Sequence, residues 1–227
     1  MIIGLLPAAG SASRMAGLPK FLLPIPEGTL FDWHTERMQA AGVSGLVLGY
    51  SDSTLRLLSK HLPPYALLYL GGHTLAHTVA NAHDVTGDHR IVFGMPDTYF
   101  TDADAYRRVI DCLERGADVA VGVFMTRPDQ RSKLGMCQLE WDRLVDVIDK
   151  PSETTLTYAW GILAWRPVFW QHIHAADATV GDALPRAIRA GLDVRAVRMD
   201  GAYYDCGTPE EYFKLIRDVT GGTDAPV

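Results

Sequence analysis

The residues best suited to do chemistry lie near the start of the chain, where two cations follow a loop of small side chains. An apolar run at residues 2–6 gives way to small residues at 8–13, and Arg14 and Lys20 follow. Small side chains let a ligand approach the backbone, whose successive N–H groups can cradle an anion. This pattern predicts a polyphosphate site. An ordinary strand-to-helix turn with two solvated cations would present the same residues.

Two other phosphate-binding loops do not fit this stretch. A Walker A loop ends in Gly-Lys-Ser/Thr, whereas this loop ends in Ser13-Arg14-Met15. The dinucleotide fingerprint needs three glycines at fixed spacing and a later acidic residue, and only Gly10 is present here.

Two aspartates are candidate ligands for a cation. Asp97 directly follows a predicted strand at residues 91–94, and Asp205 lies among aromatic and small residues just before a predicted helix. Ligands of open α/β sheets bind beyond the carboxyl ends of strands, so we expect Asp97 at the same edge as Lys20. Magnesium favours one or two carboxylates together with phosphate oxygens and water. Helix capping is the alternative, although Asp102 or Asp104 is better placed to cap the helix after Asp97.

Several other polar residues allow more than one interpretation. Thr208, which precedes Pro209, is better placed than Asp205 to cap the last helix. Lys150 ends a predicted strand and, taken alone, fits an ordinary exposed lysine. His73 and His77 share a helix face, as zinc ligands do, but no third ligand completes that site. Helix-surface or base packing is therefore the alternative for this pair.

The order of apolar segments predicts the fold class. Strands alternating with helices indicate a parallel sheet with right-handed crossovers. After residue 127 the pattern changes to a hairpin and a long extended segment. We predict an α/β protein with a Rossmann-like mixed, mainly parallel sheet flanked by helices and a small β-rich lobe. Predicted strands lie at 2–6, 43–50, 65–70, 91–94, 118–125, 135–140, 144–149, 155–165 and 194–199, and predicted helices at 30–41, 54–61, 74–83, 102 or 104 to 115, 168–174, 180–190 and 210–218.

Length and composition limit the class of protein. The 227 residues predict one domain, divided into halves at 1–127 and 128–219 with a tail at 220–227. A net charge of −6 argues against a nucleic-acid partner. No apolar run is long enough to predict a membrane span, and the N-terminus lacks a signal-peptide pattern. Three scattered cysteines indicate a reducing compartment, so we expect a cytoplasmic protein, with its oligomeric state open.

Five segments, in order, resemble the motifs of nucleotidyltransferases that make nucleoside-diphosphate sugars. The resemblance spans residues 2 to about 217. Trp160 stands where the family usually has Ala, and Ala12 where it often has Gly. The segments are Leu6-Pro7-Ala8-Ala9-Gly10-Ser11-Ala12-Ser13-Arg14-Met15 with Pro19-Lys20, then Met95-Pro96-Asp97-Thr98, Asp149-Lys150-Pro151, residues 158–163, and Asp205-Cys206-Gly207-Thr208-Pro209-Glu210-Glu211-Tyr212.

The resemblance implies a GT-A-like fold and a Mg²⁺-dependent condensation of a nucleoside triphosphate with a sugar 1-phosphate, which releases pyrophosphate. It implies that residues 1–127 bind the nucleotide and residues 128–219 the sugar phosphate. The implied roles are catalysis by Arg14 and Lys20, nucleotide binding by Ala8, Ala9, Gly10, Ser11, Gly71, Gly72 and Thr74, sugar-phosphate binding by Asp149, Lys150 and Gly161, and Mg²⁺ binding by Asp97 and Asp205.

Two rival functions remain open at this point. The opening Pro7-Ala8-Ala9-Gly10-Ser11 also resembles cytidylyltransferases that act on methylerythritol phosphate. A relative that binds nucleotide sugars without turnover would carry the same motifs. Asp102-Ala103-Asp104 has the spacing of a glycosyltransferase metal motif, but its place at a predicted helix start favours capping.

Overall fold

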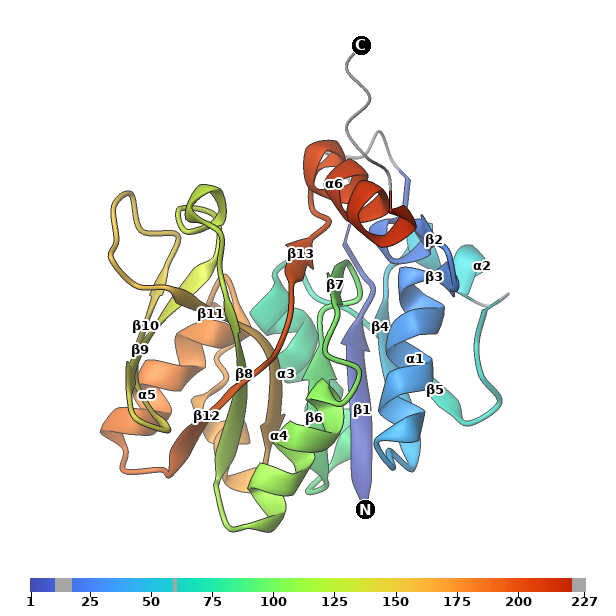
Figure 1. The fold of residues 1–227 in the computed structure, drawn as a ribbon. Coiled ribbons are helices and arrows are strands. Elements are labelled where there is room, and N and C mark those ends of the chain that lie inside the picture. The colour runs from blue at the N-terminus through green and yellow to red at the C-terminus, as the bar shows by residue number, and fades with distance from the viewer. Residues whose placement is uncertain (11–17, 59–60, 222–227) are drawn as a thin grey trace.

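The computed structural model describes residues 1–10, 18–58 and 61–221 (Figure 1). Its centre is a nine-stranded sheet in the order β5-β4-β1-β6-β11-β8-β12-β10-β9. The strands are β1 (Ile2–Pro7), β4 (Gly45–Tyr50), β5 (Ala66–Leu70), β6 (Arg90–Gly94), β8 (Val119–Met125), β9 (Gly135–Glu140), β10 (Arg143–Asp149), β11 (Tyr158–Trp165) and β12 (Val194–Arg198).

The sheet is mixed, as predicted, and seven of its nine strands run in one direction, with only β10 and β11 reversed. The neighbours β5, β4, β1 and β6 run parallel. Strand β11 then lies between β6 and β8 and is antiparallel to both. Beyond that point β12 pairs in parallel with β8, and the hairpin of β9 and β10 adds antiparallel pairs with β12 and β11.

Helices cover both faces of the sheet (Figure 1). One face carries α1 and α4, which contact each other, and the other carries α3 and α5. The helices are α1 (Leu30–Ala40), α2 (Asp52–Leu58), α3 (Leu75–Thr86), α4 (Ala105–Glu114), α5 (Ala183–Arg189) and α6 (Pro209–Thr220), with 3₁₀ turns η2 (Lys20–Leu22), η3 (Pro128–Gln130), η4 (Pro167–His172) and η5 (Val180–Asp182).

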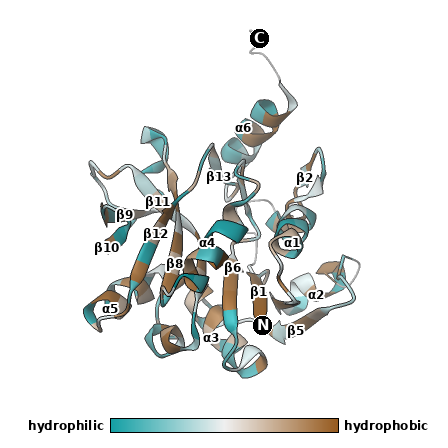
Figure 2. Cartoon of the chain, turned by 60° about the horizontal axis from the view of Figure 1, so that its bottom comes forward, coloured by the Kyte–Doolittle hydropathy of each residue, from teal (hydrophilic) through white to brown (hydrophobic). Residues whose placement is uncertain are grey.

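Burial on both faces explains the unbroken apolar runs of the central strands. In β1, Ile2 and Leu6 pack on the core beside α1, while Ile3 and Leu5 pack on the opposite core. Such two-sided burial is typical of strands covered by helices on both faces. Figure 2 shows these strands as brown segments between helices of mixed hydropathy.

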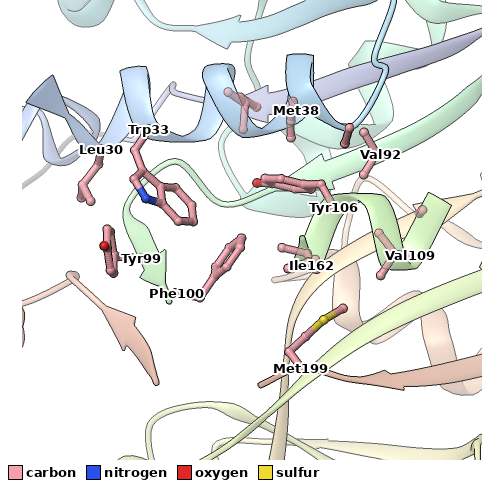
Figure 3. Packing of buried hydrophobic residues seen from close by; sticks show 14 of the residues in the cluster. Leu30, Trp33, Met38, Val92, Tyr99, Phe100, Tyr106, Val109, Ile162 and Met199 are labelled. Carbon is pink, nitrogen blue, oxygen red and sulfur yellow. The ribbon is translucent and has the colours of Figure 1, made fainter. Parts of the chain in front are cut away.

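An aromatic cluster fills the space between α1 and the sheet (Figure 3). Trp33 of α1 lies 4.6 Å from Phe100 and 4.8 Å from Tyr99 between ring centroids. Phe100 lies 5.6 Å from Tyr106 of α4. This cluster holds the segment after β6 against α1.

Two short sheets were not predicted from the sequence. One pairs β2 (Pro24–Ile25) with β3 (Gly28–Thr29). The other pairs β7 (Thr98–Phe100) with β13 (Tyr203–Asp205), with Asp205 opposite Thr98. The second sheet brings together residues that are about a hundred positions apart, and it lies beside the candidate site.

Several predicted helix limits are corrected by the structure. The helix predicted at 54–61 begins two residues earlier, at Asp52, and is described as far as Leu58. The segment predicted as helical at 168–174 is instead the 3₁₀ turn η4, and the one at 180–190 begins as η5 before α5. Pro185 in the first turn of α5 has no N–H to donate, so it fits only near a helix start. Predicted tail residues 222–227 lie outside the described residues.

The aspartates expected to cap α4 do so only in part. Asp104 is the N-cap residue, but its side chain makes no capping hydrogen bond. Asp102 instead accepts hydrogen bonds from the backbone N–H groups of Asp104 and Asp200 and from Arg108. These contacts tie the start of α4 to the loop after β12, which argues for a structural use of the Asp-x-Asp spacing.

Candidate functional site

A cavity of about 790 Å³ opens at the carboxyl ends of β1, β6 and β10. It is lined by residues from both halves of the chain. Ten of the residues predicted from the sequence line it, namely Ala8, Ala9, Gly10, Lys20, Gly72, Thr74, Asp97, Asp149, Lys150 and Asp205. Ser11 and Arg14, the predicted phosphate loop and first catalytic cation, lie outside the described residues.

Asp97, Asp205 and Lys20 form a charged cluster in this cavity. The Lys20 Nζ atom lies 3.2 Å from the Asp97 Oδ2 atom. The backbone N–H of Cys206 donates to the Asp97 carbonyl at 3.0 Å, which ties the Asp205 segment to Asp97. The N–H of Gly207 donates to the Asp205 Oδ1 atom at 3.0 Å. The structure therefore brings together the two carboxylates and the lysine that the sequence places far apart.

The electrostatics of this cluster favour a bound cation. Burial raises the pKa of Asp205 to about 6, and the nearby Asp97 carboxylate adds to the shift. The Gly207 N–H and the Lys20 ammonium oppose it. A cation between two close carboxylates would offset both the burial and the repulsion. In the described part of the chain, no three His, Cys, Asp or Glu side chains form a metal cage. Two carboxylates that leave the other positions to phosphate and water fit Mg²⁺.

A buried histidine that the sequence analysis missed holds the backbone next to Asp97. His34 of α1 is fully buried, and its Nε2 atom lies 2.9 Å from the carbonyl oxygen of Thr98. Because a carbonyl only accepts, Nε2 carries the proton and donates, and the Tyr106 hydroxyl donates to Nδ1 at 2.6 Å. Burial lowers the pKa of His34 from 6.5 to about 4, although the Thr98 hydrogen bond opposes the shift. The signal available in the sequence was only a histidine on an apolar helix face.

The small residues just after β5 allow close backbone packing beside the cavity. The N–H of Gly71 donates to the Tyr50 carbonyl at 2.7 Å. A Cβ atom at Gly71 would lie 2.4 Å from the Ala9 Cβ atom, so a side chain there would displace the loop. Gly71 itself does not line the cavity, whereas Gly72 does. The structure shows a packing role for Gly71, and the nucleotide contact expected there stays a prediction.

The N-terminus of α3 faces the same cavity. Thr74 caps this helix by accepting a hydrogen bond from the His77 N–H at 3.0 Å, and Thr74, Leu75 and Thr78 line the cavity. The positive end of a helix favours a nearby anion. His73 donates through its backbone N–H to His77 Nδ1 at 3.4 Å. This contact ties His77 to the turn before α3, and in the described part of the chain no group of three His, Cys, Asp or Glu side chains that could hold a metal includes this pair.

Lys150 and Asp149 lie on the β-rich side of the cavity. The Lys150 N–H donates to the Leu134 carbonyl at 3.1 Å, and its backbone has a φ of 44°. Lys150 Nζ lies 3.8 Å from Asp149 Oδ2, and its side chain is 59% exposed. An exposed lysine with a fixed backbone can place its ammonium on an incoming anion at little cost in desolvation.

Gly161 does not line the cavity. A Cβ atom there would lie 2.7 Å from ring atoms of Phe124 and Tyr203, so the glycine makes room for these aromatic rings. Its neighbour Trp160 lines the cavity instead. Side chains alternate across a strand, so only one of two adjacent residues can face the site.

A partly buried ion pair fixes the end of the cavity near α6. Arg127 donates to both carboxylate oxygens of Glu211, at 2.8 and 2.6 Å, and to the Tyr203 carbonyl at 3.4 Å. Thr208 caps α6, as predicted, by accepting a hydrogen bond from the Glu211 N–H at 3.5 Å. Arg127 therefore helps to hold α6 and β13 in place. Among the described residues, the cations that line the cavity include Lys20, Lys133 and Lys150.

Comparison with known proteins agrees with this geometry. Residues 4–196 match the MobA-like NTP transferase domain. The chain belongs to this family. The prediction of a nucleotidyltransferase is confirmed at the level of the family, and the rival with a glycosyltransferase metal motif loses its support.

Individual members and structural neighbours are similar over nearly their whole length. The chain is 21% identical to the Bacillus subtilis (strain 168) protein "Putative UTP--glucose-1-phosphate uridylyltransferase", covering 95% of each. A Bacillus anthracis structure named "Putative Glucose-1-Phosphate Thymidylyltransferase" superposes with a TM-score of 0.86 at 15% identity, covering 100% of this chain and 98% of that one. A UDP-glucose pyrophosphorylase complexed with UDP-glucose also gives 0.86, at 17% identity, covering 98% and 100%. These structures share the predicted fold, with a mixed sheet and flanking helices.

None of the helices in residues 1–10, 18–58 and 61–221 combines the length and apolar character needed to cross a bilayer.

Proposed function

We propose that this nucleotidyltransferase-family chain condenses a nucleoside triphosphate with a sugar 1-phosphate, giving a nucleoside-diphosphate sugar and pyrophosphate. The observation that carries the proposal is the shared cavity, in which Lys20 and Lys150 stand on walls from different halves of the chain with Asp97 and Asp205 beside them. Two phosphate-bearing substrates repel each other, and cations on opposite walls offset that repulsion. Two similar proteins are named as a UTP--glucose-1-phosphate uridylyltransferase and a glucose-1-phosphate thymidylyltransferase, and these names support the same reaction class.

The chemistry requires little more than positioning and charge neutralisation. An oxygen of the acceptor phosphate attacks the α-phosphorus, a new P–O bond forms, and the bond to the bridging oxygen breaks as pyrophosphate leaves. Lys20 would stabilise charge on the α-phosphate and the leaving group. Lys150 would hold the attacking phosphate. Arg14, which lies outside the described residues, would bind the departing pyrophosphate.

Asp97 and Asp205 would hold Mg²⁺, which when bound neutralises developing charge on the phosphates. The Lys20 ammonium lies 3.2 Å from the Asp97 carboxylate. A cation held by the two aspartates would take over the neutralisation of Asp97 and leave Lys20 to bind the triphosphate.

We also propose the division of labour between the halves. The wall formed by Ala8, Ala9, Gly10, Gly72 and Thr74 would bind the nucleotide, and the wall formed by Asp149 and Lys150 would bind the sugar phosphate. Residues 1–127 and 128–219 would then act as nucleotide-binding and sugar-phosphate-binding halves around one sheet.

The deciding experiment is a matrix of nucleoside triphosphates against sugar 1-phosphates, scored by pyrophosphate release. We expect release with at least one pair, only when Mg²⁺ is present, and its loss when EDTA removes the metal. Release with methylerythritol phosphate and CTP, but with no sugar 1-phosphate, would favour the rival cytidylyltransferase. Binding of a nucleotide sugar without turnover of any pair would favour a non-catalytic sensor.

The variant Asp97→Asn tests the metal assignment. We expect a much higher Mg²⁺ concentration for half-maximal activity and a weaker stabilisation of the substrate-free protein by Mn²⁺ in thermal melts. The matched control is Asp104→Asn, because Asp104 does not line the cavity. An unchanged Mg²⁺ requirement in Asp97→Asn would contradict the assignment.

A further inference from the structure

Trp160 forms part of the cavity wall on the sugar-phosphate side. Strand β11 pairs with β9 so that Ala159 lies opposite Met136, which brings the next residue, Trp160, opposite Gly135. Strand β9 in turn pairs with β10, with Gly135 opposite Asp149. Trp160, Gly135 and Asp149 therefore form one row across three strands, next to Lys150.

Two glycines hold the indole of Trp160 in place. A Cβ atom at Gly135 would lie 2.2 Å from Trp160 Nε1, and one at Gly181 would lie 2.8 Å from the same atom. The indole thus fits between the backbone of β9 and the turn η5 only because both positions lack a side chain. Trp160 is 6% exposed and packs near Phe93, with 6.4 Å between ring centroids. The wall is consequently rigid.

The polar groups along this row suit a ring that carries hydroxyls. An indole N–H can only donate, and Trp160 Nε1 has no acceptor among the described residues. Asp149 supplies acceptor oxygens at the other end of the row. A flat apolar face with a donor and an acceptor nearby matches a polyol ring better than a second planar base.

We propose that Trp160 determines acceptor specificity, by admitting a hexose 1-phosphate with a hydroxyl on the carbon next to the phosphate-bearing carbon and excluding its 2-acetamido counterpart. The inference rests on the proposed function, because it takes Lys150 as the group that binds the acceptor phosphate. The row adjoins Lys150, so the substituent on the neighbouring carbon is the part of the sugar that meets the indole. An indole wedged between two glycines cannot swing aside for the larger acetamido group.

The test compares kcat/KM for glucose 1-phosphate and N-acetylglucosamine 1-phosphate with the nucleoside triphosphate that works best. We expect the wild-type chain to prefer the hydroxyl form at least tenfold. In Trp160→Ala that preference should fall at least tenfold, while the KM of the nucleoside triphosphate stays within about twofold. Trp160→Phe keeps an aromatic wall but loses the N–H, and its preference for the hydroxyl sugar should fall at least threefold. This variant provides the test if Trp160→Ala does not fold.

The matched control is Trp165→Phe on the same strand. Trp165 is fully buried and packs against Phe169 and Trp170, so its replacement disturbs β11 without touching the cavity. It should lower the melting temperature and leave the preference unchanged.

Three results would overturn the inference. If the preference for the hydroxyl sugar in both Trp160 variants stays within twofold of wild type, this inference fails and the proposed function stands. The same holds if the wild-type chain favours the acetamido sugar. Lack of turnover with every sugar 1-phosphate would overturn the proposed function, and this inference with it. The sugar matrix therefore distinguishes the two failures.

Discussion

The ammonium of Lys20 is expected to carry a large share of transition-state stabilisation, and Lys20→Met removes it with little change in side-chain length. In the structure Lys20 Nζ approaches the Asp97 carboxylate to 3.2 Å in a cavity where its side chain is 24% exposed. A unit charge about 4 Å from a phosphate oxygen, at an effective dielectric constant of about 20, is worth about 4 kcal/mol. Removing one charge-stabilising group typically costs about 2.7–4 kcal/mol. We therefore expect kcat/KM to fall by about 10² to 10³.

The fold should survive this change. The Lys20 and Asp97 side chains are both partly exposed, and such ion pairs contribute about 1 kcal/mol or less to stability. Lys214→Met is the matched control, because Lys214 lies on α6 and does not line the cavity. Initial rates of pyrophosphate release at saturating Mg²⁺, together with thermal melts, measure both effects. A Lys20→Met enzyme within about threefold of wild type would refute the assignment.

Two further predictions concern the acceptor wall and the buried histidine. Lys150→Met should raise the KM of the sugar 1-phosphate about tenfold, the equivalent of about 1.4 kcal/mol, with little change for the nucleotide; equal effects on both KM values would contradict its place on the acceptor side. Burial lowers the pKa of His34 from 6.5 to about 4. Between pH 6.5 and about pH 4, His34 is therefore protonated in the unfolded chain and neutral in the folded chain. The free energy of unfolding should be highest above pH 6.5 and fall by about 3 kcal/mol by pH 4. Denaturant titrations of wild type and His34→Gln should show that the free energy of unfolding falls less with decreasing pH in the variant. If it falls equally in both proteins, His34 is not the cause.

The strands and helices of residues 1–127 could be read largely from the sequence, because their patterning is local. The apolar runs that became β1, β4 and β6 are buried on both faces, and Gly42 follows α1 where the pattern stops. A predicted limit failed where tertiary contacts decide it, as at the 3₁₀ turn η4. The direction of β11 in the sheet also lies outside any local signal, because it depends on where the hairpin of β9 and β10 returns the chain.

For the candidate site too, some residues could be predicted from the sequence and others only from the structure. Residue type and local position singled out Lys20, Asp97 and Asp205, and the family resemblance added Lys150. The structure gathers all four around one cavity. Gly71 and Gly161 were also predicted to contact substrate, yet each packs against residues that are distant in the sequence. Local patterning does not reveal such neighbours. The sequence also offered no sign that His34 would support the backbone beside Asp97.

The sequence by itself determined which chemical groups this protein carries and the local structures that present them, since apolar periodicity, small-residue loops and charge are properties of neighbouring residues. Only the tertiary structure decided which groups meet. The pairing of β7 with β13 sets Asp205 opposite Thr98, and the row across β11, β9 and β10 sets Trp160 beside Gly135. Such contacts join residues up to about a hundred positions apart, and they form because burying the two cores and pairing the strands of one sheet leaves the chain a single arrangement.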